Sequence, residues 1–131
     1  SKKQSKLYLG NIYAKRDWGH AKDYVKAMWL MLQQKKPKDY VIATGQQYSV
    51  KEFINLTAKK LNMSIVWKGK SLNEKAYYDN KLIIEINPKY FRPSEVNSLK
   101  GNAQKAKKEL LWKPKYTIDT LIDDMIKSIN K

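Results

Sequence analysis

Apolar residues recur at helical spacing in three parts of the chain. From Gly19 to about Gln34 they stand three and four positions apart, which predicts a helix with one buried face. That face comprises Ala21, Tyr24, Val25, Met28 and Leu32, and Trp29 and Met31 widen it. Ser49 and Glu52 have the spacing of a capping box, so a second helix begins after Ser49. Thr117 is placed to cap a last helix.

The second and last helices each have an apolar stripe that predicts burial on one side. The stripes are Val50, Phe53, Ile54, Thr57, Ala58 and Leu61 in one, and Ile118, Leu121, Ile122, Met125, Ile126 and Ile129 in the other. Between them, Asn102 is placed to cap a short helix that runs to about Leu111. The pattern therefore predicts four helices.

Short apolar segments between the helices have the composition of strands. Residues 40–44 end at a glycine and predict a buried strand whose tip reaches a loop. Residues 64–68 and 81–86 predict two more strands, with a loop or hairpin connection between them. Residues 7–10 form an apolar stub that we expect to be too brief for an independent strand. The pattern predicts an α/β fold of helices with short strands.

Length and composition restrict the class of protein. A chain of 131 residues with no internal repeat or low-complexity linker is interpreted as one domain, residues 1–131. It contains no cysteine, which excludes disulfides, thiolate metal sites and cysteine nucleophiles, and favours an intracellular location. No apolar run approaches the roughly 20 residues that span a bilayer. We expect a cytoplasmic protein without a membrane partner.

The net charge is +15, from 27 basic and 12 acidic residues. Such an excess is typical of proteins that bind polyanions, but lysines spread along the whole chain are also typical of solvated surface. Only two of the basic residues are arginine, Arg16 and Arg92. A planar guanidinium can grip a phosphate or carboxylate through two parallel hydrogen bonds, or form a structural ion pair. The residues alone leave both roles open.

Conventional catalytic sets are missing from the sequence. It has no glycine-rich phosphate loop, no nucleophile elbow and one histidine, His20, which we interpret as a capping or packing residue. Asp123 and Asp124 are neighbours on a predicted helix, so their side chains point in different directions, and we expect both in solvated surface. We predict no catalytic residue and no metal site in this chain.

Several motifs together resemble GDP-mannose 4,6-dehydratases, which are extended short-chain dehydrogenases/reductases. They occur in that family's order: Ala14-Lys15-Arg16-Asp17-Trp18-Gly19-His20, Asp39-Tyr40-Val41-Ile42-Ala43-Thr44-Gly45, Tyr90-Phe91-Arg92-Pro93-Ser94-Glu95-Val96, Lys105-Ala106-Lys107-Lys108 and Trp112-Lys113-Pro114. The resemblance implies that Arg16 and Arg92 grip the substrate diphosphate, and that Glu95 accepts a hydrogen bond from a ribose hydroxyl. Asp17 is interpreted as an orienting or capping residue that accepts local backbone hydrogens.

The resemblance also implies the chemistry of the whole enzyme. Members of that family are lyases that convert GDP-mannose to GDP-4-keto-6-deoxymannose with loss of water, on a tightly held NADP, in the synthesis of GDP-fucose and related deoxyhexoses. The glycine-rich dinucleotide loop and the catalytic tyrosine–lysine pair lie earlier in the family's chain than the Arg16 motif. This chain then corresponds to the C-terminal, substrate-binding part. We expect it to hold no cofactor, to be inactive alone, and to work with the missing Rossmann half in a homo-oligomer.

Four positions depart from the family's usual pattern. Tyr13 and Gln46 replace an aspartate and a glutamate, Asn102-Ala103 replaces an aspartate–proline pair, and Leu111 replaces a glycine. Two alternatives stay open. The chain could be the substrate domain of another nucleotide-sugar dehydratase or epimerase, which competition between GDP and UDP sugars distinguishes. It could also be a basic module for nucleic acid, whose affinity would fall steeply with salt.

Overall fold

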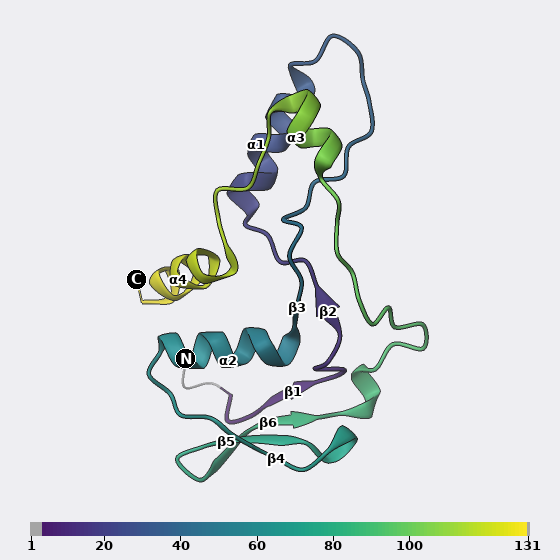
Figure 1. The fold of residues 1–131 in the computed structure, drawn as a ribbon. Coiled ribbons are helices and arrows are strands. Elements are labelled where there is room, and N and C mark those ends of the chain that lie inside the picture. Colours follow the sequence, from purple (N-terminus) through teal and green to yellow (C-terminus); the bar gives the residue numbers. More distant parts are fainter. Residues whose placement is uncertain (1–3, 131) are drawn as a thin grey trace. The chain divides into compact units, whose positions relative to one another are not determined.

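The computed structural model describes residues 4–130 and divides the chain into two compact units (Figure 1). The first unit contains the residues up to Ala14 and Ser49–Asn97, and the second contains Lys15–Tyr48 and the residues from Ser98 onward. The chain therefore passes between the units three times, after Ala14, Tyr48 and Asn97.

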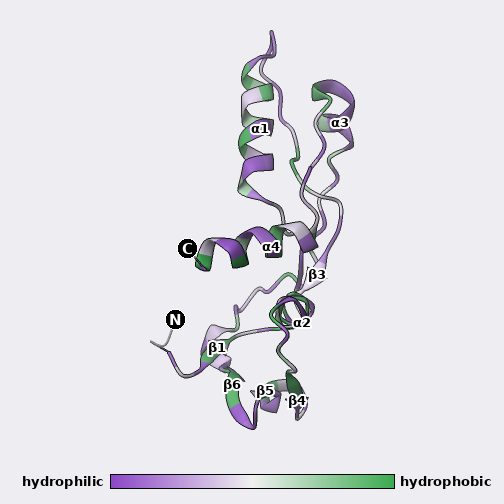
Figure 2. Ribbon diagram, turned by 90° about the vertical axis from the view of Figure 1, so that its left-hand side faces the viewer, coloured by the Kyte–Doolittle hydropathy of each residue, from purple (hydrophilic) through white to green (hydrophobic). Residues whose placement is uncertain are grey.

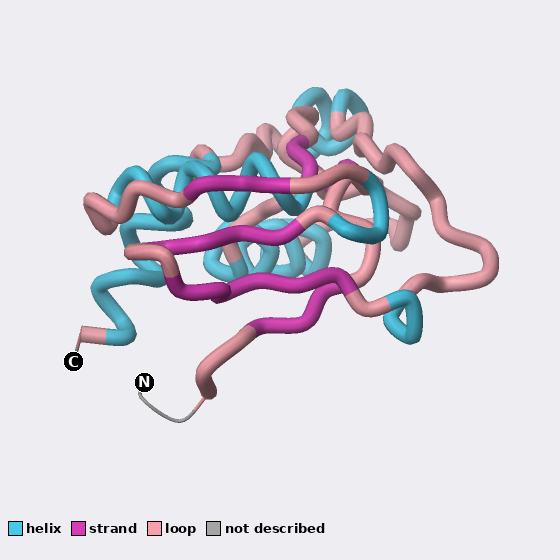
Figure 3. Tube along the Cα trace, turned by 90° about the horizontal axis from the view of Figure 1, so that it is seen from below, coloured by secondary structure: helices cyan, strands magenta, loops and turns pink. Residues whose placement is uncertain are grey.

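A four-stranded sheet of order β1-β6-β5-β4 organises the first unit (Figure 3). Its strands are β1 (Leu7–Leu9), β4 (Val66–Lys68), β5 (Lys75–Tyr78) and β6 (Lys81–Ile86). β5 is antiparallel to both β4 and β6, whereas β1 is parallel to β6. The β5–β6 hairpin turns at Asp79 and Asn80, whose φ angles of 48° and 62° suit a two-residue hairpin turn.

One strand of this sheet differs from the sequence-based prediction. The apolar stub at the N-terminal end does form a strand, because β6 supplies the parallel ladder for Leu7–Leu9 from far along the chain. Between the predicted strands 64–68 and 81–86, the hairpin alternative is correct, since β5 lies there and pairs with both neighbours. The predicted strands themselves are confirmed as β4 and β6.

Helix α2 (Val50–Lys60) lies over one face of this sheet (Figures 1 and 3). The predicted capping box is present. The Ser49 hydroxyl accepts the Glu52 N–H at 3.1 Å, and the Glu52 carboxylate accepts the Ser49 N–H at 2.8 Å. Two short 3₁₀ turns, η1 (Ser71–Asn73) and η2 (Pro88–Tyr90), complete the unit. Its buried apolar residues are Ile12, Ala14, Ala58, Ala76, Ile84 and Ile86.

A buried carboxylate ties the η1 region to α2. Glu74 is 3% exposed, and its two oxygens accept hydrogen bonds from the Tyr13 hydroxyl and the Lys51 ammonium. The Lys51 nitrogen also lies 5.5 Å from the centre of the Tyr13 ring and 4.9 Å from that of Trp67. Burial raises the pKa of Glu74, but the hydrogen bonds from Lys51 and Tyr13 together outweigh it, so the pKa is lowered.

Replacing Glu74 by glutamine tests this cluster. The lowered pKa means that the ionised Glu74 stabilises the fold above its unfolded pKa, near 4.5, and that this stabilisation is lost as the pH falls through the folded value. At pH 7 we expect Glu74→Gln to cost about 2 kcal/mol, because Lys51 loses its charged partner. Urea unfolding of both proteins at neutral and acidic pH measures the difference. A difference that stays constant on acidification would contradict the ion pair.

The second unit contains three helices and a small sheet. Its elements are β2 (Lys15–Arg16), α1 (Ala21–Leu32), α3 (Gln104–Leu110) and α4 (Ile118–Ile129), and β2 pairs with β3 (Tyr48–Ser49), where the chain enters the first unit. The core is formed by α1, α3 and the residues next to them: Ala27, Ala106, Leu110 and Trp112, with Leu30, Met31, Tyr40, Ile42 and Ala103 packed around. No helix within residues 4–130 has the length and apolar character needed to cross a membrane.

The predicted buried face of α1 is wrong. The helix exists as expected, but its buried residues are Asp23 and Ala27, while Val25, Met28, Trp29 and Leu32 are exposed by 62%, 61%, 53% and 81%. Figure 2 shows the apolar positions along α1 as green bands. The stripe of α4 is only half correct, since Ile118 and Ile122 are buried whereas Met125 and Ile129 are exposed.

The predicted strand at residues 40–44 is also absent. Tyr40 and Ile42 are half-buried and Val41 is exposed, but Ala43 is buried, so the alternation of a strand is not kept to the end of the segment. However, residues 39–43 form no backbone–backbone hydrogen bond with any described residue. The segment therefore has the apolar sequence of a strand, but no neighbouring strand among the described residues pairs with it.

Candidate functional site

Arg16 lies on β2 in the second unit and is half-buried. One of its guanidinium nitrogens, Nη1, donates to the carbonyl oxygen of Lys15 at 2.8 Å. The same carbonyl accepts the Leu99 N–H at 3.1 Å, which joins β2 to the segment that precedes α3. The backbone next to Arg16 is thus held by a hydrogen bond from Leu99, which is distant in the sequence but lies in the same unit.

The carboxylate of Asp17 forms hydrogen bonds with two loops of the second unit. It accepts hydrogen bonds from the Thr44 N–H at 3.0 Å, the Thr44 hydroxyl at 2.5 Å, the Gly45 N–H at 2.9 Å and the Gly101 N–H at 3.3 Å. The expectation of local backbone partners is therefore wrong, because the N–H donors come from residues 44, 45 and 101. Gly101 fits only because it lacks a side chain, since a Cβ there would lie 2.1 Å from the Cβ of Ala43.

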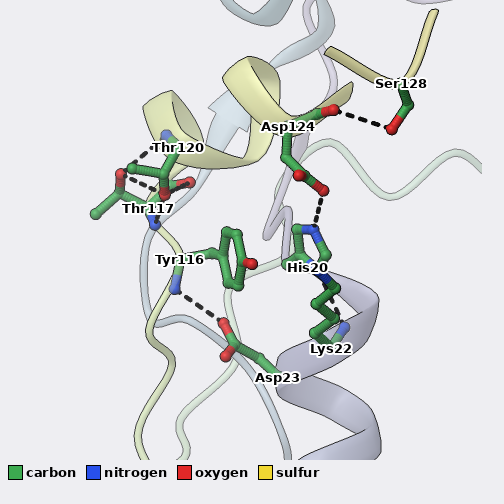
Figure 4. Close-up of polar contacts among 8 residues, drawn as sticks. All are labelled: His20, Lys22, Asp23, Tyr116, Thr117, Thr120, Asp124 and Ser128. Carbon is green, nitrogen blue, oxygen red and sulfur yellow. Dashed lines mark hydrogen bonds and ion pairs between the residues drawn. The ribbon is translucent and has the colours of Figure 1, made fainter. Parts of the chain in front are cut away.

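His20 is the N-cap of α1 and is 7% exposed (Figure 4). Its Nδ1 accepts the Lys22 N–H at 3.0 Å, so Nδ1 carries no hydrogen and the ring is the neutral tautomer protonated at Nε2. Nε2 donates to Asp124 at 2.8 Å, and the ring stacks on Tyr116 with centroids 3.8 Å apart. The predicted capping and packing role of His20 is confirmed.

Asp124 was predicted to be solvated surface, and its side chain is 40% exposed, but the prediction missed a partner. Its carboxylate receives the His20 hydrogen bond, and that bond is the main reason why the pKa of Asp124 is lowered. The contact links α4 to the start of α1, which follows Arg16 and Asp17 directly. Both ends of the segment 16–20 are therefore anchored, at Asp17 and at His20.

Asp23 is a buried residue that the sequence analysis did not single out. It is 5% exposed, and its carboxylate accepts the backbone N–H groups of Lys115 and Tyr116 at 3.1 and 3.0 Å (Figure 4). Its carbonyl oxygen accepts the indole N–H of Trp112 at 2.9 Å. An acidic residue within an apolar helical pattern was the available signal, and only the fold identifies its partners.

A cavity of about 560 Å³ adjoins the loops that Asp17 holds. It is lined by Ala43, Thr44, Gly45, Lys100, Gly101, Asn102, Ala103, Gln104, Lys107, Trp112, Lys113 and Pro114. Its volume suits a small ligand, and none of its lining residues is acidic. It contains none of the three predicted substrate-binding residues.

Arg92 and Glu95 lie in the first unit, after the 3₁₀ turn η2. No helix or strand contains them, which confirms that Arg92 is on a loop; Arg92 is exposed and Glu95 is half-buried. The turn before them is closed by hydrogen bonds from the Tyr90 N–H to Asn87 and from the Phe91 N–H to Pro88, both at 3.0 Å. Because Arg16 belongs to the other unit, the convergence of the two arginines stays a prediction.

Metal ligation finds no support among the side chains of residues 4–130. They contain no group of three or more histidine, aspartate or glutamate residues that could surround an ion.

The fold is that of one part of an extended short-chain dehydrogenase/reductase. The dTDP-glucose 4,6-dehydratase of Bacillus anthracis, solved in complex with NAD, superposes with a TM-score of 0.69 at 22% identity; the match covers 96% of this chain and 34% of that one. At this level of identity the likeness concerns the fold alone.

Sequence comparison then defines the family. The GDP-mannose 4,6 dehydratase family profile matches residues 1–125, and the chain belongs to this family. The Dictyostelium discoideum GDP-mannose 4,6 dehydratase is 52% identical over 122 residues, which is 92% of this chain and 34% of that protein. The human protein is 49% identical over 120 residues, 90% of this chain and 32% of its own length. The chain thus spans about a third of the curated relatives that it matches.

Proposed function

We propose that this chain is the substrate-binding domain, residues 1–131, of a GDP-mannose 4,6-dehydratase. In this proposal Arg16 and Arg92 bracket the diphosphate of GDP-mannose, and Glu95 accepts a hydrogen bond from a ribose hydroxyl. Membership of the family is the main support for the proposal. The alignment with the Dictyostelium discoideum GDP-mannose 4,6 dehydratase covers more than nine tenths of this chain. The anchoring of the Arg16 segment at Asp17 and His20 supports it, since a gripping side chain needs a fixed backbone.

The complete enzyme is proposed to be a cytoplasmic, homo-oligomeric lyase that uses NADP to convert GDP-mannose to GDP-4-keto-6-deoxymannose. The five glycines of this chain stand singly, and none forms the G-x-G-x-x-G loop that cradles the pyrophosphate of a dinucleotide. The cofactor supplies hydride transfer when it is bound, and we assign its binding to the Rossmann half of the enzyme. This chain contributes binding and orientation of the substrate and is inactive alone.

Conservative replacement of the arginines tests the substrate grip. Lysine keeps the charge but removes the planar fork, so we expect Arg16→Lys and Arg92→Lys each to weaken GDP-mannose binding about tenfold. Calorimetry with GDP-mannose, GDP and UDP-glucose measures affinity and selectivity together. Lys35→Gln, which removes an exposed charge from the second unit, is the control and should bind as the unaltered chain does.

Two outcomes would contradict the assignment. Equal affinity for all three ligands would remove the GDP specificity and favour another nucleotide-sugar enzyme. Affinity that is unchanged in both arginine variants, but falls steeply with salt, would favour a lysine-dominated polyanion surface.

A further inference from the structure

The 3₁₀ turn η2, which precedes Arg92, rests directly on the backbone of Gly10. A Cβ atom added at Gly10 would lie 2.5 Å from the carbonyl oxygen of Tyr90 and 2.8 Å from its carbonyl carbon. Both distances are far below the roughly 3.5 Å at which carbon atoms pack without repulsion. Gly10 does not have a positive φ angle, so a left-handed backbone is not the reason for glycine at this position. The close approach of Tyr90 is the reason.

The backbone on both sides of Gly10 is held in place. The Leu9 carbonyl accepts the Asn87 N–H at 2.8 Å, where β1 and β6 end side by side (Figure 1). The Ile12 carbonyl accepts the Lys51 N–H at 2.9 Å, and Ile12 is only 1% exposed. Because hydrogen bonds fix Gly10 from both directions, a side chain at this position would displace the turn and not the strand.

The turn would pass such a displacement on to Arg92. The Asn87 carbonyl accepts the Tyr90 N–H at 3.0 Å, and the Asn87 side-chain oxygen accepts the Lys89 N–H at 3.0 Å. Phe91 is the single residue between the turn and Arg92, and it is extended, with φ −74° and ψ 133°. A turn closed in this way has little internal freedom. Moving Tyr90 by roughly 1 Å, to ordinary contact distance, therefore moves the backbone of Arg92 as well.

We propose that Gly10 is a positioning residue for the nucleoside diphosphate: it supports the turn that carries Arg92 and thereby sets where the guanidinium group meets the phosphates. Gly10 itself touches no ligand. A planar fork that grips phosphate through two parallel hydrogen bonds tolerates little displacement, because the donor–acceptor distances of such bonds span only about 0.5 Å. This inference rests on the proposed function, because it concerns the way in which Arg92 binds the diphosphate.

The first test needs no ligand. Gly10→Ala should shift the backbone amide resonances of residues 90–92, since the added methyl group displaces the turn. Gly69→Ala is the matched control in the same unit, because a Cβ there would lie 2.4 Å from the carbonyl oxygen of Asn73. The control should shift resonances near Asn73 and leave those of residues 90–92 in place. Resonances of residues 90–92 that are unchanged in Gly10→Ala would overturn the proposal.

The second test is a double-mutant cycle of Gly10→Ala and Arg92→Ala, with the affinity for GDP measured by calorimetry. Alone, Gly10→Ala should weaken GDP binding about tenfold, as expected for a binding group misplaced by about 1 Å. In the Arg92→Ala background it should weaken binding less than about twofold, because the group that it positions is gone. Gly69→Ala should leave the affinity unchanged. Equal losses from Gly10→Ala in both backgrounds would indicate a merely structural role and overturn the proposal.

Asn87→Ala provides a second variant if Gly10→Ala does not fold. It removes the acceptor of the Lys89 N–H and adds no atom, so it loosens the same turn without a clash. Its effect on GDP binding should also vanish in the Arg92→Ala background, and equal effects in both backgrounds would again overturn the proposal.

Failure of the proposed function has a different signature. If Arg92→Ala alone left the affinity for GDP unchanged, Arg92 would not grip the diphosphate, and the proposed function would fail. If Arg92→Ala weakened binding but the losses from Gly10→Ala and Arg92→Ala were additive, only the positioning role of Gly10 would fail. Absence of GDP binding by the unaltered chain would overturn both.

Discussion

Replacing Asp17 by alanine is expected to lower the free energy of unfolding by about 3 kcal/mol, because three backbone N–H groups and the Thr44 hydroxyl lose one shared acceptor. The loops at Thr44–Gly45 and Gly101 would no longer be tied to the residue that follows Arg16. Binding of GDP-mannose should weaken as well, since the backbone that carries Arg16 loses its anchor. Denaturant unfolding and calorimetry on the same protein measure the two effects.

Two control variants distinguish the loss of the Asp17 carboxylate from the general effect of replacing an aspartate. Asp17→Asn keeps one acceptor oxygen and should recover part of the stability. Asp39→Ala removes an exposed aspartate from the same unit and should change stability by less than about 0.5 kcal/mol. If Asp17→Ala were as stable as Asp39→Ala, the carboxylate would not hold the loops in solution.

Asp23→Ala should destabilise the second unit by a comparable amount, about 3 kcal/mol. Its carboxylate is buried and is the acceptor for the N–H groups of Lys115 and Tyr116, which would lose that partner. The segment between α3 and α4 would loosen, and with it the stacking of Tyr116 on His20. Near-ultraviolet circular dichroism reports the aromatic packing, and urea unfolding reports the free energy.

The carbonyl of Asp23 provides an internal comparison. It accepts the Trp112 indole N–H whatever side chain stands at position 23, so the tryptophan contact should survive the substitution. Fluorescence of a variant that has lost the Tyr116 packing but retains a buried Trp112 would match this expectation. Unchanged stability of Asp23→Ala would mean that water replaces the carboxylate without cost, contrary to its burial.

Local chemistry made part of this fold predictable from the sequence. The Ser49 and Thr117 caps involve partners three residues away, so the starts of α2 and α4 follow from short motifs. The residue before Pro93 avoids the helical region, and Arg92 accordingly lies on a loop. Features of this kind need no knowledge of the rest of the chain.

Features that depend on distant partners were mispredicted or missed. β1 exists because β6 pairs with it, and the buried carboxylate of Asp23 accepts N–H groups that lie 92 and 93 residues further along the chain. An apolar pattern shows that a helix face avoids water, but not which part of the protein covers it. For the same reason Arg16, Arg92 and Glu95 could be nominated from composition and resemblance, while their meeting at one ligand is left to the binding experiment.

The chain crosses between the two units at three points, and this has a consequence for protein engineering. Within the first unit, Ala14 and Ser49 are already neighbours, because the Val50 N–H donates to the Ala14 carbonyl at 3.3 Å and the Lys51 N–H donates to that of Ile12 at 2.9 Å. The segment between them is therefore an insertion whose two ends meet, a geometry that protein designers use to exchange or excise a module. A direct connection of Ala14 to Ser49, with the chain ended at Asn97, would isolate the first unit. The hydrogen bonds between the strands of its four-stranded sheet would stay intact.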